Sequence, residues 1–158
     1  MVPGATRRYH TKDSACAIMR QTAAARSSRY AAADELGEWL DNMEWDYWAT
    51  WTFRKKRSAR SVRRALEGHI KRIGASRAFW AVESGKVNGR LHAHGLLYFS
   101  GLIPPKAQAI WEDWWTKDGA RGRAEIDRYD SDSGAAHYVT EYVTKEIADY
   151  DLQGSDFG

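Results

Sequence analysis

The chain has 158 residues, a formal net charge of +3 and a single cysteine, Cys16. This length predicts one domain with a hydrophobic core of its own. A single cysteine excludes an internal disulfide and any cysteine-built metal site, so a metal would have to be held by histidines and carboxylates. The sequence has no run of about 18 apolar residues and no secretory signal, so we expect a cytoplasmic protein, in a bacterial host cell, without a membrane partner.

Residues 1–45 are predicted to form a basic arm followed by a first helix. In the first thirty residues Asp13 is the one acid among several arginines and lysines. This composition suits an organelle transit peptide and, equally, an arm that lies on a phosphate backbone. From about Ser28 to Asn42, apolar residues recur at helical spacing and predict a helix.

The next two elements are a strand and a helix. Aromatic residues and threonines alternate over residues 46–53, which predicts a strand with Thr50 and Thr52 on one face. Residues 59–73 are predicted to form a helix that ends at Gly74. The buried side of this helix is expected to carry Val62, Leu66, Ile70 and Ile73.

The remaining elements complete a split β-α-β pattern. Residues 77–83 and 90–99 predict a hairpin, and a helix rich in tryptophan follows Pro104 and Pro105, with its tryptophans in the core. Then come a strand over residues 122–129 and a last helix from Gly134 to about Asp149. The expected fold is α+β, an antiparallel sheet of about four to five strands with a ferredoxin-like or RRM-like core. Helices are expected on one face and the chemistry on the other.

Basic residues are concentrated in residues 54–77, where ten lysines and arginines face the single acid Glu67. Such a block is typical of a solvated helix face, but it also suits a surface that binds a polyanion. If the partner is a nucleic acid, we expect the contacts from Arg54, Lys55, Lys56, Arg57 and Arg90.

Two histidines on the second arm of the hairpin are candidates for a metal site. His92 and His94 are two residues apart on a strand, so their side chains share a face. The first arm ends in Glu83, which the turn brings back beside them. Two imidazoles and one carboxylate would hold a divalent ion and leave positions open for substrate, as catalytic sites require.

The predicted last helix carries two tyrosines and a lysine along one stripe. Tyr138 and Tyr142 are four residues apart and Lys145 follows three residues later. A phenol is a weak nucleophile at neutral pH, but it can attack a phosphodiester that a divalent ion polarises. Lys145 would favour the phenolate or offset the charge that develops on phosphorus. The product would be a covalent phosphotyrosine.

These motifs resemble the HUH superfamily of single-stranded-DNA endonucleases, in the order found in rolling-circle replication initiators (Rep proteins). The resemblance rests on Trp48–Phe53, on His92-Ala-His94 with Glu83, and on Tyr138-x-x-x-Tyr142-x-x-Lys145. The two tyrosines are similar to those of initiators from small single-stranded-DNA phages and plasmids. The resemblance implies Mg²⁺ or Mn²⁺ as cofactor, nicking of a single-stranded or hairpin origin, a 5′-phosphotyrosine, and rejoining by the second tyrosine.

The resemblance also bears on partners and domain limits. No phosphate-binding loop of the helicase type occurs in the sequence, so unwinding would need a host helicase, and synthesis a host polymerase. The expected organisation is an arm and helix over 1–45, the endonuclease domain over 46–150 and an acidic tail over 151–158.

Three alternatives remain at this point. The chain could be an HUH transposase-type enzyme that nicks and transfers DNA strands. It could also be a noncatalytic single-stranded nucleic-acid-binding domain whose sheet stacks bases. Two histidines and a carboxylate also occur in oxygenases that use ferrous iron, although the tyrosine pair and the basic block would then be unexplained.

Overall fold

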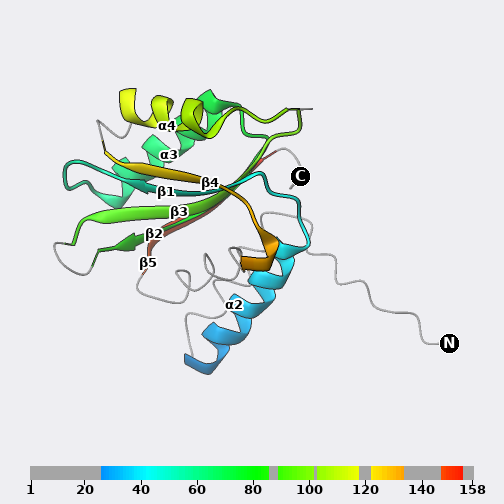
Figure 1. Cartoon of the computed structure of the whole chain (residues 1–158). Helices are drawn as coiled ribbons and strands as arrows, with labels where there is room; N and C mark the ends of the chain where they lie inside the picture. Colours follow the sequence, from blue (N-terminus) through cyan, green and yellow to red (C-terminus); the bar gives the residue numbers. More distant parts are fainter. Residues whose placement is uncertain (1–25, 86–88, 102, 118–121, 134–146, 155–158) are drawn as a thin grey trace.

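The structure is a computed structural model and describes residues 26–85, 89–101, 103–117, 122–133 and 147–154. Helices and strands alternate along these ranges much as the sequence predicts (Figure 1). The helices are α2 (Arg26–Asp41), α3 (Ala59–Ile73) and α4 (Ala107–Thr116), and a short 3₁₀ turn, η2, spans Ser131–Ser133. The strands are β1 (Tyr47–Thr52), β2 (Arg77–Ser84), β3 (Leu91–Tyr98), β4 (Ala124–Arg128) and β5 (Ile147–Gly154).

The five strands form one sheet in the order β4-β1-β3-β2-β5, and each neighbouring pair is antiparallel. Strand β3 lies between β1 and β2, which α3 connects, so the β-α-β unit is split as expected. The predicted α+β fold with an antiparallel sheet is therefore confirmed.

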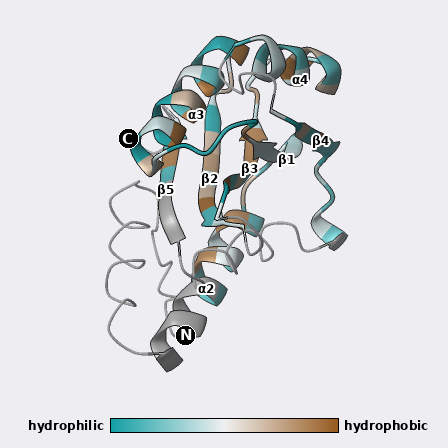
Figure 2. Cartoon of the chain, turned by 90° about the vertical axis from the view of Figure 1, so that its left-hand side faces the viewer, coloured by the Kyte–Doolittle hydropathy of each residue, from teal (hydrophilic) through white to brown (hydrophobic). Residues whose placement is uncertain are grey.

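Helices α3 and α4 cover one face of the sheet (Figure 1). Teal and brown segments alternate along both helices in Figure 2, as expected for helices with one buried side. Ser58 caps the start of α3 by accepting a hydrogen bond from the Ser61 amide, and Gly74 ends the helix at a φ of 73°. The main core between these helices and the sheet includes Tyr47, Trp51, Val62, Leu66, Trp80, Leu97 and Trp114.

Helix α2 packs against the opposite face of the sheet, at one end. Its buried side chains form a second, smaller apolar cluster with residues from β2, β3 and β5. The described part of the chain places no helix over the other end of this face (Figure 1). We call the uncovered end, which carries Thr50, Glu83, His92 and His94, the open face. The second cluster consists of Leu36, Trp39, Leu40, Trp45, Phe79, Leu96 and Leu152.

The tryptophans of α4 only partly follow the expectation of core packing. Trp114 is fully buried, whereas Trp115 is 38% exposed and stacks on the half-buried Trp111 with ring centroids 5.4 Å apart. Residues 111 and 115 are one helical turn apart, so they share a stripe that faces away from the position of Trp114.

The C-terminal region differs from the prediction. Residues 147–149 were expected in a helix and 151–158 in an acidic tail, but residues 147–154 form β5, which pairs with β2. Asp151 is buried and accepts a hydrogen bond of 2.9 Å from Arg63 of α3, while Leu152 belongs to the second cluster. The described acids of this segment thus belong to a strand that covers the edge of β2. No helix in the described ranges is long and apolar enough to cross a membrane.

Candidate functional site

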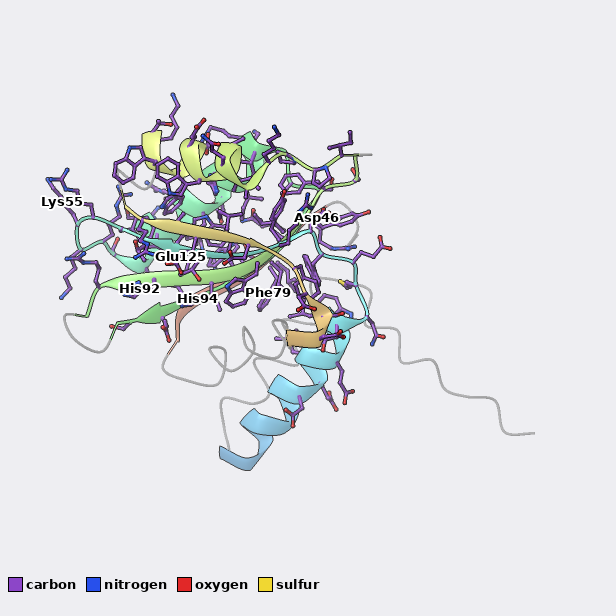
Figure 3. The ribbon with its side chains drawn as sticks, viewed as in Figure 1. Asp46, Lys55, Phe79, His92, His94 and Glu125 are labelled. Atoms are coloured by element: carbon purple, nitrogen blue, oxygen red, sulfur yellow. The ribbon has the colours of Figure 1, made fainter. Side chains whose placement is uncertain are left out.

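The three predicted metal ligands lie on adjacent strands of the open face. Glu83 of β2 is directly opposite His92 of β3 in the sheet register. His94 is two residues further along β3, and Figure 3 shows both histidines on the ribbon of that strand. The prediction that these side chains share one face away from α3 and α4 follows directly from this register.

Glu83 and His94 form the closest pair of the site. The Oε1 atom of Glu83 is 3.4 Å from Nε2 of His94, and the histidine side chain is 11% exposed. The other ring nitrogen, Nδ1, lies 3.1 Å from the Thr50 hydroxyl on β1. The indole of Trp48 stacks on the imidazole with centroids 5.9 Å apart and planes 28° apart. Carboxylate, hydroxyl and indole therefore surround the His94 ring.

His92 lies apart from this pair, at the turn of the hairpin. A Cβ atom placed on Gly85 would be 2.7 Å from Nε2 of His92, so the imidazole rests against this glycine. Among the described residues, no three His, Cys, Asp or Glu side chains are grouped so as to hold a metal ion. Bringing His92 to Glu83 and His94 requires its side chain to rotate away from Gly85.

The donor atoms nevertheless suit a divalent ion. Two imidazoles and one carboxylate form a mixed nitrogen and oxygen set that leaves coordination positions for other ligands. The contact between Nδ1 of His94 and the Thr50 hydroxyl leaves Nε2 directed at Glu83, which is the arrangement that a metal-binding histidine needs. The residues thus fit the group that the motif implies, with His92 as the member that must move.

Sequence reasoning did not identify Thr50 and Trp48 as parts of the site. Their alternation predicts that Thr50 shares a face with Thr52, but it does not say which strand lies beside β1. In the sheet, Thr50 is opposite His94 and Thr52 is opposite His92. The split β-α-β order, in which β1 and β3 are neighbours, is the signal that could have placed them.

Three of the predicted DNA-contacting residues gather at the same end of the sheet as Glu83 and His92. Arg54, Lys55 and Lys56 are exposed in the loop between β1 and α3, and Figure 3 shows Lys55 at this end. A Cβ on Gly89 would be 3.7 Å from Nζ of Lys56, so the loop reaches the hairpin turn.

The other two predicted contacts, Arg57 and Arg90, are half-buried. The guanidinium of Arg57 lies over the Phe53 ring, 5.0 Å from its centroid. Arg90 directly precedes β3, and its carbonyl accepts a hydrogen bond of 2.8 Å from the Gly85 amide. The backbone of Arg90 therefore helps to close the hairpin beside His92.

Two other members of the basic block have partners within the protein. Arg63 bonds to Asp151, and Arg72 makes two hydrogen bonds to Asp113, of 3.0 and 2.9 Å. These arginines join α3 to β5 and to α4. The basic block is therefore divided between structural ion pairs and an exposed loop.

The predicted nucleophiles lie outside the described residues. Tyr138, Tyr142 and Lys145 belong to the segment 134–146, whereas the described chain resumes at Ile147. The backbone of Ile147 pairs with Glu83. In the sequence, Tyr142 thus comes five residues before the residue that pairs with Glu83.

Comparison with known proteins adds a family to this geometry. A model of the replication-associated protein ORF2 family matches residues 46–147. The chain belongs to this family. No curated protein matches the chain. The matched segment covers all three sequence motifs, from the residue before β1 to the first residue of β5.

Membership in this replication-associated family bears on the alternatives. It supports a role in DNA replication and favours that role over an oxygenase with the same ligand types. In this family context, the basic loop beside Glu83 and His92 is read as a nucleic-acid contact more readily than as a solvated surface.

Proposed function

We propose that this replication-associated protein is an HUH endonuclease of the two-tyrosine Rep type. It nicks and rejoins single-stranded DNA at an origin and so supports rolling-circle replication. The observation that carries the proposal is the pairing of Glu83 with His94 on the open face, with His92 directly opposite Glu83. The family match, which covers the three motifs, supports the same reading.

Glu83, His92 and His94 would hold Mg²⁺ or Mn²⁺. A divalent ion there would supply Lewis-acid polarisation of a phosphate oxygen at the scissile bond. The protein contributes a fixed carboxylate and imidazole, a partly buried setting, and a face of the sheet that substrate can reach. The half-buried setting strengthens the attraction between the ligands and a cation relative to bulk water.

The proposed nucleophile of the first step is Tyr142. Its phenolic oxygen forms a bond to phosphorus while the bond from phosphorus to the 3′ oxygen breaks. The products are a 5′-phosphotyrosine and a free 3′ hydroxyl, which a host polymerase extends after a host helicase opens the duplex. Lys145 stabilises the phenolate or the charge on phosphorus, and Tyr138 serves the later strand transfer.

The test is a search for a covalent adduct. Purified protein is incubated with single-stranded and hairpin oligonucleotides and Mn²⁺, and products are resolved on denaturing gels and by peptide mass. We expect DNA attached to Tyr142 in the wild-type protein and a strongly reduced yield in Tyr142→Phe. Tyr129→Phe is a matched control, because the Tyr129 hydroxyl bonds to Asp41 away from the site.

Other outcomes would separate the alternatives. DNA binding without an adduct on any oligonucleotide, with either ion, would contradict the proposal and indicate a noncatalytic binding domain. An adduct that joins DNA ends without a preference for an origin-like sequence would indicate a transposase-type enzyme. An adduct formed at full rate by Tyr142→Phe would assign the first step to Tyr138.

A further inference from the structure

We infer that Thr50 is a positioning residue that holds the imidazole of His94 in its metal-binding orientation. The inference rests on the proposed metal site but concerns a residue outside the ligand set. Its basis is the 3.1 Å contact between the Thr50 hydroxyl and Nδ1 of His94, together with the direction of Nε2 toward Glu83.

The first step of the argument concerns the two nitrogens of the ring. An imidazole that binds a metal through Nε2 needs its lone pair there and its proton on Nδ1. The Thr50 hydroxyl can accept a hydrogen bond from Nδ1–H, and it can also donate one when Nδ1 carries the lone pair. Thr50 therefore stays bonded to the ring whether or not Nε2 is bound, and it favours the required tautomer on binding.

The second step concerns the tilt of the ring. Trp48 stacks on the imidazole, and its indole packs against the second cluster beneath α2. The indole restricts rotation out of the plane, while the hydroxyl opposes a flip that would exchange Nδ1 and Nε2. Together they leave the Nε2 side of the ring directed at Glu83.

The contrast with His92 supports the role of Thr50. Both histidines have a threonine opposite them on β1, but the Thr52 hydroxyl donates to the carbonyl of Arg123 at 2.8 Å. The threonine opposite His92 is thus bonded to the segment before β4, and His92 rests against Gly85. The histidine that bonds to its threonine is the one that faces Glu83.

The experiment compares Mn²⁺ affinity and ring signals in three variants. Thr50→Val removes the hydroxyl at nearly constant volume, Thr50→Ser keeps it, and Thr52→Val removes the neighbouring hydroxyl on the same strand. Binding is measured by titration calorimetry and by electron paramagnetic resonance. The ring nitrogens of His94 are followed by ¹⁵N NMR in the metal-free protein. Circular dichroism verifies that each variant is folded.

We expect Thr50→Val to bind Mn²⁺ about tenfold or more weakly, as is typical when a partner of a metal-bound histidine is lost. Thr50→Ser and Thr52→Val should bind within about twofold of wild type, and only Thr50→Val should shift the Nδ1 signal of His94. Equal affinity and unchanged ring signals in Thr50→Val would overturn the inference. Failure of the wild-type protein to bind Mn²⁺ would instead contradict the proposed function, and the ring signals would still decide the role of Thr50.

Discussion

Glu83 and His94 meet diagonally across β2 and β3, with Oε1 of the carboxylate 3.4 Å from Nε2 of the imidazole. Glu83 is opposite His92 in the register and His94 is opposite Ala81, so the long carboxylate side chain reaches past its direct neighbour. Diagonal pairs of this kind are within reach of long side chains on a twisted sheet. The small side chain of Ala81 leaves room for this contact.

Removing the charge of Glu83 should therefore impair any metal-dependent reaction of the open face. We expect Glu83→Gln to lower Mn²⁺-dependent adduct formation and Mn²⁺ affinity by at least about tenfold, because an amide is a much poorer ligand than a carboxylate. The yield of adduct is measured on denaturing gels over a range of Mn²⁺ concentrations. Glu67→Gln is a matched control, since Glu67 lies on α3, 3.6 Å from Arg63. Equal loss in both variants would argue against a specific role for Glu83.

A buried histidine should make Asp113 important for stability. Oδ2 of Asp113 is 2.7 Å from Nδ1 of the fully buried His69, and Arg72 bonds to the same carboxylate. Asp113→Asn should lower the free energy of unfolding by about 2 kcal/mol, the usual scale for hydrogen bonds to a charged group. Urea unfolding measures this loss. Glu112→Gln on the exposed side of α4 should change it by less than about 0.5 kcal/mol.

The contribution of Asp113 should also depend on pH. Partial burial tends to raise the pKa of this carboxyl group, but hydrogen bonds from Arg72 and His69 and their charges outweigh it, so the pKa lies below its usual value. In the unfolded chain the group titrates near its ordinary pKa of about 3.9. The stabilisation is therefore complete above this value and is lost as pH falls through the lowered pKa of the folded protein. The stability gap between wild type and Asp113→Asn should be constant near neutral pH and shrink in acid.

Gly95 should be intolerant of a side chain, because β3 is tightly enclosed at this position. A Cβ there would clash with the carbonyl oxygen of Phe79 and lie 3.0 Å from both the Trp51 ring and the Trp80 Cβ. We expect Gly95→Ala to cost about 2 kcal/mol of stability, within the usual range for overpacked cores. Gly101→Ala is the control, since its nearest neighbour, the carbonyl of Ile103, would be 3.9 Å away. Equal melting temperatures for the two variants would contradict the tight enclosure of Gly95.

The sequence predicts the sheet and its faces well, since alternation along Trp48–Phe53 and Leu91–Phe99 is a direct consequence of strand geometry. It identifies Glu83, His92 and His94 as neighbours because a short turn joins their strands. It does not predict that the His92 ring rests on Gly85, since alternation assigns a face and leaves the side-chain rotamer open.

Long-range neighbours were the other features that the sequence did not reveal. The acids of residues 151–158 suggested a solvated tail, but Asp151 is buried because Arg63, far away in the sequence, bonds to it. The contact between Thr50 and His94 likewise depends on strand order. Both features follow from which elements meet in three dimensions, and local patterns carry little of that information.

The exposed loop after β1 should contribute to DNA binding through charge. Lys56 approaches the hairpin turn near Gly89, so a phosphate backbone entering the open face at this end would pass its ammonium group. We expect Lys56→Ala to weaken binding of a single-stranded oligonucleotide similarly for all sequences. The slope of log affinity against log salt should fall by about 0.7, as for loss of one phosphate contact on a single strand. Fluorescence anisotropy over a range of NaCl concentrations measures both quantities.

Lys106→Ala provides the matched control for this loop. Lys106 is also an exposed lysine, but it precedes α4 on the side of the sheet away from the open face. Its replacement removes the same charge from the whole molecule, so a general effect of net charge would weaken binding equally in both variants. A salt slope that falls only in Lys56→Ala would locate the phosphate contact in the loop after β1. Identical slopes in the two variants and the wild-type protein would exclude this loop from the DNA path.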